Sequence, residues 1–95
     1  MARFVSLLNW TDHWIKTATD TVDRAEAAQK VAAEMGGSLE IYWTMGQYDM
    51  IAITEFADDE TAMAFLAKAS SLGNVHSQTM RAFDADGVRS IMGKM

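Results

Sequence analysis

The chain has 95 residues, a formal net charge of -5 and no cysteine. This length fits a single domain over residues 1–95. The acidic balance argues against a nucleic-acid partner, because phosphate binding needs a basic surface. The absence of cysteine excludes disulfides and thiolate chemistry and suits a reducing cytoplasm. No apolar run approaches the roughly 20 residues that span a bilayer, so we expect a cytoplasmic protein without membrane contact.

The first third of the chain predicts a strand followed by helical segments. Residues 3–10 alternate large apolar groups on both faces, which is typical of a strand with no plain solvent side. Thr11 is a plausible N-cap for a short helical turn that reaches Ala18. A longer helix, capped by Asp20 or Thr21, should extend to about Met35, because its apolar residues recur at intervals of three and four. The pair Gly36-Gly37 should end it.

The central third of the chain predicts one long antiparallel hairpin. Residues 39–45 and 48–56 are rich in aromatic and β-branched side chains, which suit a pleated surface. They flank a two-residue break, Gly46-Gln47, whose glycine permits the positive φ of a tight hairpin turn. This hairpin is the strongest structural signal in the sequence.

The last third predicts a helix, a strand and a short final helix. Asp58-Asp59-Glu60 should open the helix and Gly73-Asn74 should end it, while residues 75–83 and 84–94 form the strand and the last helix. The resulting order, β-α-β-β-α-β, is that of the ferredoxin-like α+β fold. We therefore expect a four-stranded antiparallel sheet in the order 4-1-3-2 with both long helices on one face. A different α+β meander is the alternative.

Two helices cover only one face of such a sheet, and the other face of a monomer should be polar. Here both faces are apolar. The side chains assigned to the helix side are Val5, Leu7, Ile41, Trp43, Ile51 and Ile53. The side chains assigned to the open side, as an oligomer interface, are Phe4, Leu8, Trp10, Tyr42, Met50 and Phe56. A patch of this size is unusual on a soluble monomer, so we expect a homodimer or higher homo-oligomer that packs sheet to sheet.

Two questions about this face stay open at the level of sequence. The final helix could fold across the face instead of a second copy, although it is short for four strands. The fourth strand presents either the set that includes Ser77, Thr79 and Arg81 or the alternate set to the open side.

Several separated short motifs occur along the chain: Gly46-Gln47-Tyr48-Asp49, Asp58-Asp59-Glu60, Ser71-Leu72-Gly73-Asn74-Val75 and Arg81-Ala82-Phe83. Together they resemble the GYD domain family, which is named for a Gly-Tyr-Asp signature. The resemblance covers essentially the whole chain and implies a ferredoxin-like fold of the dimeric α/β-barrel type, without implying a particular chemistry. One departure is Thr11-Asp12-His13-Trp14, where members of the family tend to have a glycine soon after Thr-Asp.

The signature residues Tyr48 and Asp49 allow two interpretations. In the functional one, a phenol and a carboxylate lie at the rim of a small-molecule pocket, positioned for hydrogen bonding or proton transfer. In the structural one, Asp49 binds turn amides or pairs with Arg3, and Tyr48 packs in the oligomer interface. The structural interpretation is favoured, because Gly and Asp near turns usually serve backbone geometry.

The two histidines, His13 and His76, should lie at one edge of the sheet in this topology. No ligand spacing typical of a metal site accompanies them, so no metal is expected. His13 remains a candidate catalytic residue beside Tyr48 and Asp49. Trp10 and Trp14 could stack on a flat ligand at a cleft mouth, although core packing is the simpler role for tryptophan. The candidate ligand-binding residues are thus Trp10, Trp14, Tyr48, Asp49 and His76.

The sequence therefore predicts a homo-oligomeric small-molecule-binding or interaction module without a cofactor. The alternative is a small dimeric-barrel enzyme of the monooxygenase, isomerase or decarboxylase type that acts on a small hydrophobic metabolite. That alternative rests on fold analogy, and one fold serves many functions. An enzyme needs a largely apolar pocket, whereas an interior filled by Phe4, Leu8, Met50 and Phe56 would leave none.

Overall fold

The computed structural model describes residues 1–11, 18–70 and 75–95. The predicted turn after Thr11 and the predicted helix end at Gly73-Asn74 lie outside these residues. The elements are β1 (Ala2–Trp10), the 3-10 turn η1 (Ala18–Asp20), α2 (Thr21–Glu34), β2 (Ser38–Trp43), β3 (Met50–Phe56), α3 (Asp59–Ser70), β4 (Val75–Ala82) and α4 (Ala85–Met92).

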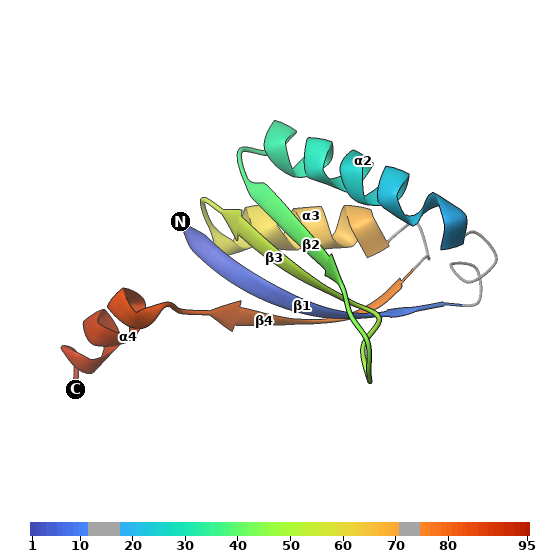
Figure 1. Cartoon of the computed structure of the whole chain (residues 1–95). Helices are drawn as coiled ribbons and strands as arrows, with labels where there is room; N and C mark the ends of the chain where they lie inside the picture. Colours follow the sequence, from blue (N-terminus) through green and yellow to red (C-terminus); the bar gives the residue numbers. More distant parts are fainter. Residues whose placement is uncertain (12–17, 71–74) are drawn as a thin grey trace.

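The four strands form one antiparallel sheet in the order β2-β3-β1-β4. The predicted order, 4-1-3-2, names the same neighbours from the opposite edge. Helices α2 and α3 lie on one face of the sheet, and the other face carries no helix (Figure 1). The described part of the chain thus has the α+β, ferredoxin-like arrangement that the element order predicted.

The ends of the long helices follow from local chemistry. Gly36 takes a φ of 80° directly after α2 and Gly37 donates its N–H to the Ala32 carbonyl at 2.9 Å, so the predicted glycine C-cap is confirmed. Asp58 caps α3 by accepting from the Thr61 N–H at 2.7 Å. Asp20 precedes α2, but its side chain makes no capping hydrogen bond.

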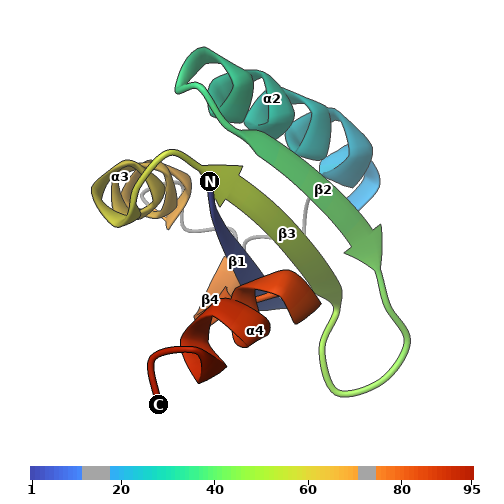
Figure 2. The same cartoon turned by 90° about the vertical axis from the view of Figure 1, so that its left-hand side faces the viewer.

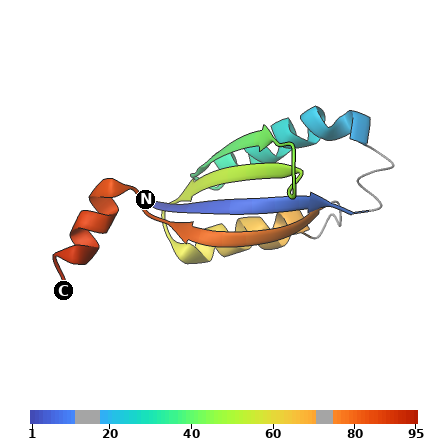
Figure 3. The same cartoon turned by 60° about the horizontal axis from the view of Figure 1, so that its bottom comes forward.

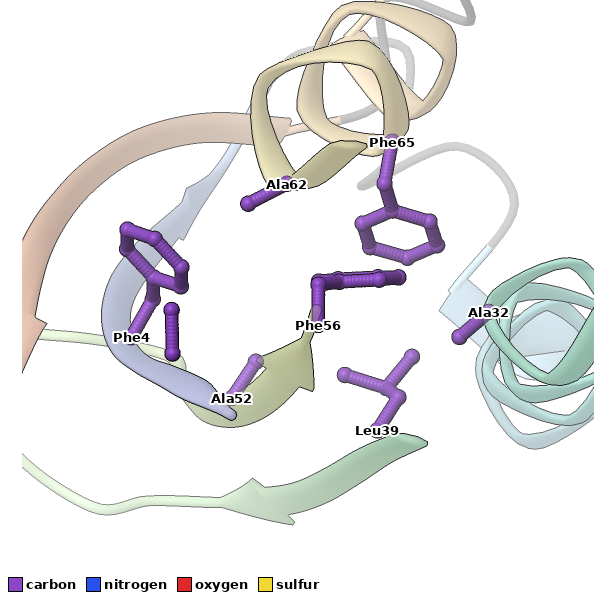
Figure 4. Packing of buried hydrophobic residues seen from close by; sticks show 8 residues of the cluster. Phe4, Ala32, Leu39, Ala52, Phe56, Ala62 and Phe65 are labelled. Atoms are coloured by element: carbon purple, nitrogen blue, oxygen red, sulfur yellow. The ribbon is translucent and has the colours of Figure 1, made fainter. Parts of the chain in front are cut away.

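The core lies between the helices and the sheet and is built from phenylalanine and alanine. Phe56 is fully buried, and its ring centre lies 5.2 Å from that of Phe65 on α3 (Figure 4). Ala32 on α2 and Ala62 on α3 are also buried against it. Because the alanine side chain is small, α2 and α3 approach the sheet closely. The space that remains between them is filled by a few aromatic rings.

The predicted assignment of faces is wrong for β1 and β3. Phe4, Met50 and Phe56, expected on the open side, are buried on the helix side, and Leu8 packs against the same core. Trp10 shares their face of β1 by alternation. Of the six side chains predicted for the oligomer interface, only Tyr42 lies on the open face, and the other five lie on the helix side. Conversely, the open face carries Val5, Leu7, Ile51 and Ile53, which were expected under the helices.

The physical reason is that both faces are apolar, so alternation alone does not say which face is covered. The Ala-rich helices dock on the face with small residues, where Ser6, Ala52 and Thr54 are buried. Val5, Leu7, Ile51 and Ile53 occupy the other face, whereas Leu8, Leu39 and Ile41 pack on the helix side. The open question of β4 is settled by its register, since Arg81 lies opposite Phe4 and Thr79 opposite Ser6, both on the helix side.

Helix α4 stands apart from the rest of the fold. It continues from the end of β4 and projects beyond the sheet (Figure 3), and none of its residues is buried. The possibility that the final helix folds across the open face is therefore not what the structure shows. No helix in the described stretches is both long and apolar enough to cross a bilayer.

Candidate functional site: the open face of the sheet

The open face is a grid in which strand register aligns the side chains in rows. The first row is Ser38, Glu55, Arg3 and Ala82; the second is Glu40, Ile53, Val5 and Met80; the third is Tyr42, Ile51, Leu7 and Gln78. Asn9 and His76 pair beyond the third row. The second and third rows thus hold a contiguous apolar centre. Met80 extends it to the β4 edge, and polar residues border most of the rest.

The apolar centre is shielded only by its own neighbours. Val5, Leu7, Ile51 and Ile53 are each partly exposed, and Met80 is 42% exposed at the edge of the patch. No element in the described part of the chain covers them. An apolar centre inside a polar rim is the usual anatomy of a protein–protein interface.

The charged groups at one end of this face are paired within the chain. The Arg3 guanidinium donates from Nε to the Glu55 carboxylate at 2.8 Å. This hydrogen bond and the charge of Glu55 raise the pKa of Arg3. Because the charges of Arg3 and Glu55 neutralise one another, burying this pair in an interface costs less free energy than burying either charge alone.

A second polar pair lies on the edge strand β2. The Tyr42 hydroxyl donates to the Glu40 carboxylate at 2.8 Å, and this hydrogen bond raises the pKa of the phenol. Tyr42 is 54% exposed and keeps its predicted place on the open face. An exposed aromatic ring beside an apolar patch is a typical interface residue.

The signature aspartate joins two strands. The Asp49 carboxylate accepts from the Trp10 backbone N–H at 2.8 Å, and the Asp49 N–H donates to the Leu8 carbonyl at 2.9 Å. These bonds fix the end of β1 to the start of β3. As the structural interpretation expected, the Asp49 carboxylate binds a backbone amide, but this amide belongs to β1 and not to the turn, and the suggested partner Arg3 is wrong. Arg3 lies at the far end of β1 with Glu55, because β1 and β3 run antiparallel.

The hairpin turn is longer than the predicted two-residue break. Strand β2 ends at Trp43 and β3 begins at Met50, so six residues, 44–49, connect them. The Thr44 hydroxyl donates to the Tyr48 carbonyl at 2.6 Å, and the Thr44 N–H donates to the Asp49 carbonyl at 2.9 Å. Gly46 takes a φ of 129°, which favours glycine at this position. The loop is thus closed at its base by the residues around the signature.

The remaining predicted site residues do not gather into one cluster. His76 lies on the open face opposite Asn9, whereas Trp10 lies on the opposite side of the sheet. His13 and Trp14 lie outside the described residues. In the described ranges, no three His, Asp or Glu side chains come close enough to hold a metal ion. Trp43 donates its indole N–H to the Thr21 hydroxyl at 2.9 Å, which ties β2 to the start of α2.

A groove of about 490 Å³ lies where β1 and β4 meet the base of α4. Its lining includes Arg3, Glu55, Arg81 and Phe83. The Arg81 guanidinium stacks 4.5 Å from the centre of the Phe83 ring and donates to the Ala82 carbonyl at 2.8 Å. Both guanidinium groups of the groove are therefore engaged by neighbours in the chain. Sequence reasoning did not anticipate this groove, because it depends on where α4 leaves the sheet.

Comparison with known proteins supports the fold and the family. The structure resembles the crystal structure of TTHA0845 from Thermus thermophilus, with a TM-score of 0.58 and 24% sequence identity, over 90% of this chain and 96% of that one. No curated protein matches the sequence. The family model for the GYD domain matches residues 4–92, which is nearly the whole chain. The chain therefore belongs to the GYD domain family.

Proposed function

We propose that this chain is a homo-oligomeric interaction module and that a second copy covers the open face of its sheet. Two sheets stacked in this way would make the dimeric α/β barrel type of assembly. The observation that carries the proposal is the apolar centre of Val5, Leu7, Ile51 and Ile53, which no element of the described chain covers.

The size of the face suits this role. Four strands about 4.8 Å apart, each about seven residues long at roughly 3.4 Å per residue, give a footprint of about 460 Å². Stable dimers bury on the order of 800 Å² of accessible surface on each partner, and side chains that project from such a footprint carry more accessible surface than the flat footprint itself. The paired charges of Arg3 and Glu55 at the rim add polar contacts without leaving an isolated buried charge.

The whole chain also exposes more surface than a compact monomer of its mass. Its accessible surface is 6412 Å², whereas a folded monomer of this mass exposes about 5,400 Å². The difference of about 1,000 Å² is what a chain shaped for assembly should show. The enzyme alternative gains no support from Asp49, because its carboxylate binds a backbone amide of β1.

Substitution at the centre of the face tests the proposal. Ile51→Lys places a charge in the middle of the apolar rows and should convert the oligomer to a folded monomer, seen by light scattering after size exclusion. Met63→Lys is the matched control, because Met63 is 66% exposed on α3 and lies away from this face. It should leave the mass unchanged. Met80→Lys repeats the test at the exposed edge of the patch and should also give a folded monomer. A charge there is more easily tolerated by the folded monomer than a charge at Ile51.

The proposal fails if the Ile51→Lys and Met80→Lys variants keep the mass and elution volume of the wild type. Circular dichroism establishes that each variant is folded. A variant that unfolds is replaced by the other, since the two positions differ in exposure.

A further inference from the structure

Helix α4 carries an apolar stripe that stays largely exposed in the described part of the chain. Val88, Ile91 and Met92, spaced by three and four residues, are 41%, 44% and 61% exposed. A helix of eight residues is not stable alone in water, where about 12–15 residues are marginal. The stripe therefore indicates that α4 is completed by packing against another surface.

The start of α4 is nevertheless well fixed. Asp84 caps the helix by accepting from the Gly87 N–H at 2.8 Å, and only Phe83 and Asp84 separate α4 from β4. The Phe83 ring is held under the Arg81 guanidinium. The position of the helix is thus set by the end of β4, and its stripe cannot reach far from that corner of the sheet.

A second projection lies at the opposite corner. The loop of residues 44–49 leaves the sheet at the far ends of β2 and β3, and both it and α4 reach toward the side away from α2 and α3 (Figure 2). Met45 in this loop is 101% exposed, and Tyr42 beside it is 54% exposed. Each corner therefore offers apolar surface that the chain itself leaves uncovered.

The overall dimensions agree with a fold from which α4 and the loop of residues 44–49 project. The radius of gyration is 14.3 Å, whereas a compact chain of this length has about 12.4 Å. The longest and shortest extents are 49 Å and 17 Å. The extra length lies along the direction in which α4 extends the sheet (Figure 3).

We propose that α4 of each copy packs on the β2–β3 corner of the other, with Val88, Ile91 and Met92 covering Tyr42 and Met45. This contact rests on the proposed sheet-to-sheet dimer. In this dimer the two-fold axis lies between the two sheets and runs along the diagonal that joins the other two corners. It therefore places the α4 corner of one copy opposite the loop corner of its partner. The contact is then made twice, as an isologous interface requires, and the strands of the two sheets cross at a steep angle.

Cross-linking tests which surface α4 meets. The chain has no cysteine, so Met92→Cys can carry a single benzophenone group. With a mixture of ¹⁵N-labelled and unlabelled chains, we expect cross-links between copies that map to peptides containing residues 42–48. Ser90→Cys, on the opposite side of α4, is the matched control and should give few such products. Cross-links confined to one chain, or directed to another part of the partner, overturn the contact.

The dissociation constant separates this contact from the dimer itself. Ile91→Lys should weaken the dimer about tenfold or more, whereas Ser90→Lys should leave the dissociation constant unchanged. If the wild type dimerises and Ile51→Lys dissociates it, but Ile91→Lys has no effect, the α4 contact is wrong and the proposed function stands. If the wild type does not self-associate, the proposed function fails and the α4 contact fails with it.

Discussion

Gly37 lies so close to Phe56 that no side chain fits between them. A Cβ atom on Gly37 would overlap the Phe56 ring and the Glu55 carbonyl oxygen. The close approach brings the start of β2 onto the end of β3 where the largest core side chain is fully buried. The glycine pair after α2 thus has two separate roles, since Gly36 supplies the left-handed turn and Gly37 supplies the space.

These roles predict different costs of substitution. Gly37→Ala should destabilise the chain by at least about 2 kcal/mol, because backbone overlap cannot be relieved by a rotamer change. Gly36→Ala should cost about 1 kcal/mol, since it has open space but a positive φ. Urea unfolding of both variants measures the order. Equal stabilities would show that the approach of Gly37 to Phe56 is not a constraint.

The contact between Asp49 and Trp10 gives a prediction about the family signature. Asp49→Ala removes an acceptor from the backbone N–H of Trp10 and should lower the free energy of unfolding by about 1.5–3 kcal/mol. Asp49→Asn retains an acceptor oxygen and should lose less. Thermal unfolding of the two variants compares them. A fully stable Asp49→Ala protein would remove the structural role assigned to this carboxylate.

The cap of α3 gives a prediction about pH. The Thr61 hydroxyl and backbone N–H donate to the Asp58 carboxylate and hold its pKa below the ordinary value of 3.8. A depressed folded pKa means that the group stabilises the fold above the unfolded pKa, and that this contribution is lost as the pH falls through the folded pKa. The stability difference between wild type and Asp58→Asn should therefore be present at pH 6 and shrink below about pH 4. A difference that is the same at pH 6 and pH 3 would contradict this assignment.

The elements were predictable because their signals are local. The β-rich runs around Gly46, the acidic start of α3 and the glycines after α2 each act within a few residues, and the strands and long helices lie where these signals place them. The length of the hairpin turn could not be predicted from local signals, because the hydrogen bonds between Asp49 and β1 set the start of β3. The sequences of β2 and β3 alone do not show these bonds.

The assignment of faces was wrong for β1 and β3 although one signal for it was present. A break at Gly46-Gln47 pairs Ile41 with Ala52, which is the observed register, and side chains directly opposite share a face. The predicted assignment placed Ile41 with Ile51 instead. Applying the cross-strand rule would have put Ala52 and Met50 with Ile41, leaving only which face the helices cover. That choice depends on how closely the alanines of α2 and α3 approach the sheet, which is a tertiary property.

The most direct test of the central claim is the mass of the wild-type chain in solution. The chain has a mass of 10.5 kDa, and static light scattering at micromolar concentration distinguishes one copy from several. We expect a mass of at least twice the single-chain value, because the open face leaves its apolar centre uncovered in one copy. A monodisperse species of 10.5 kDa would contradict the account.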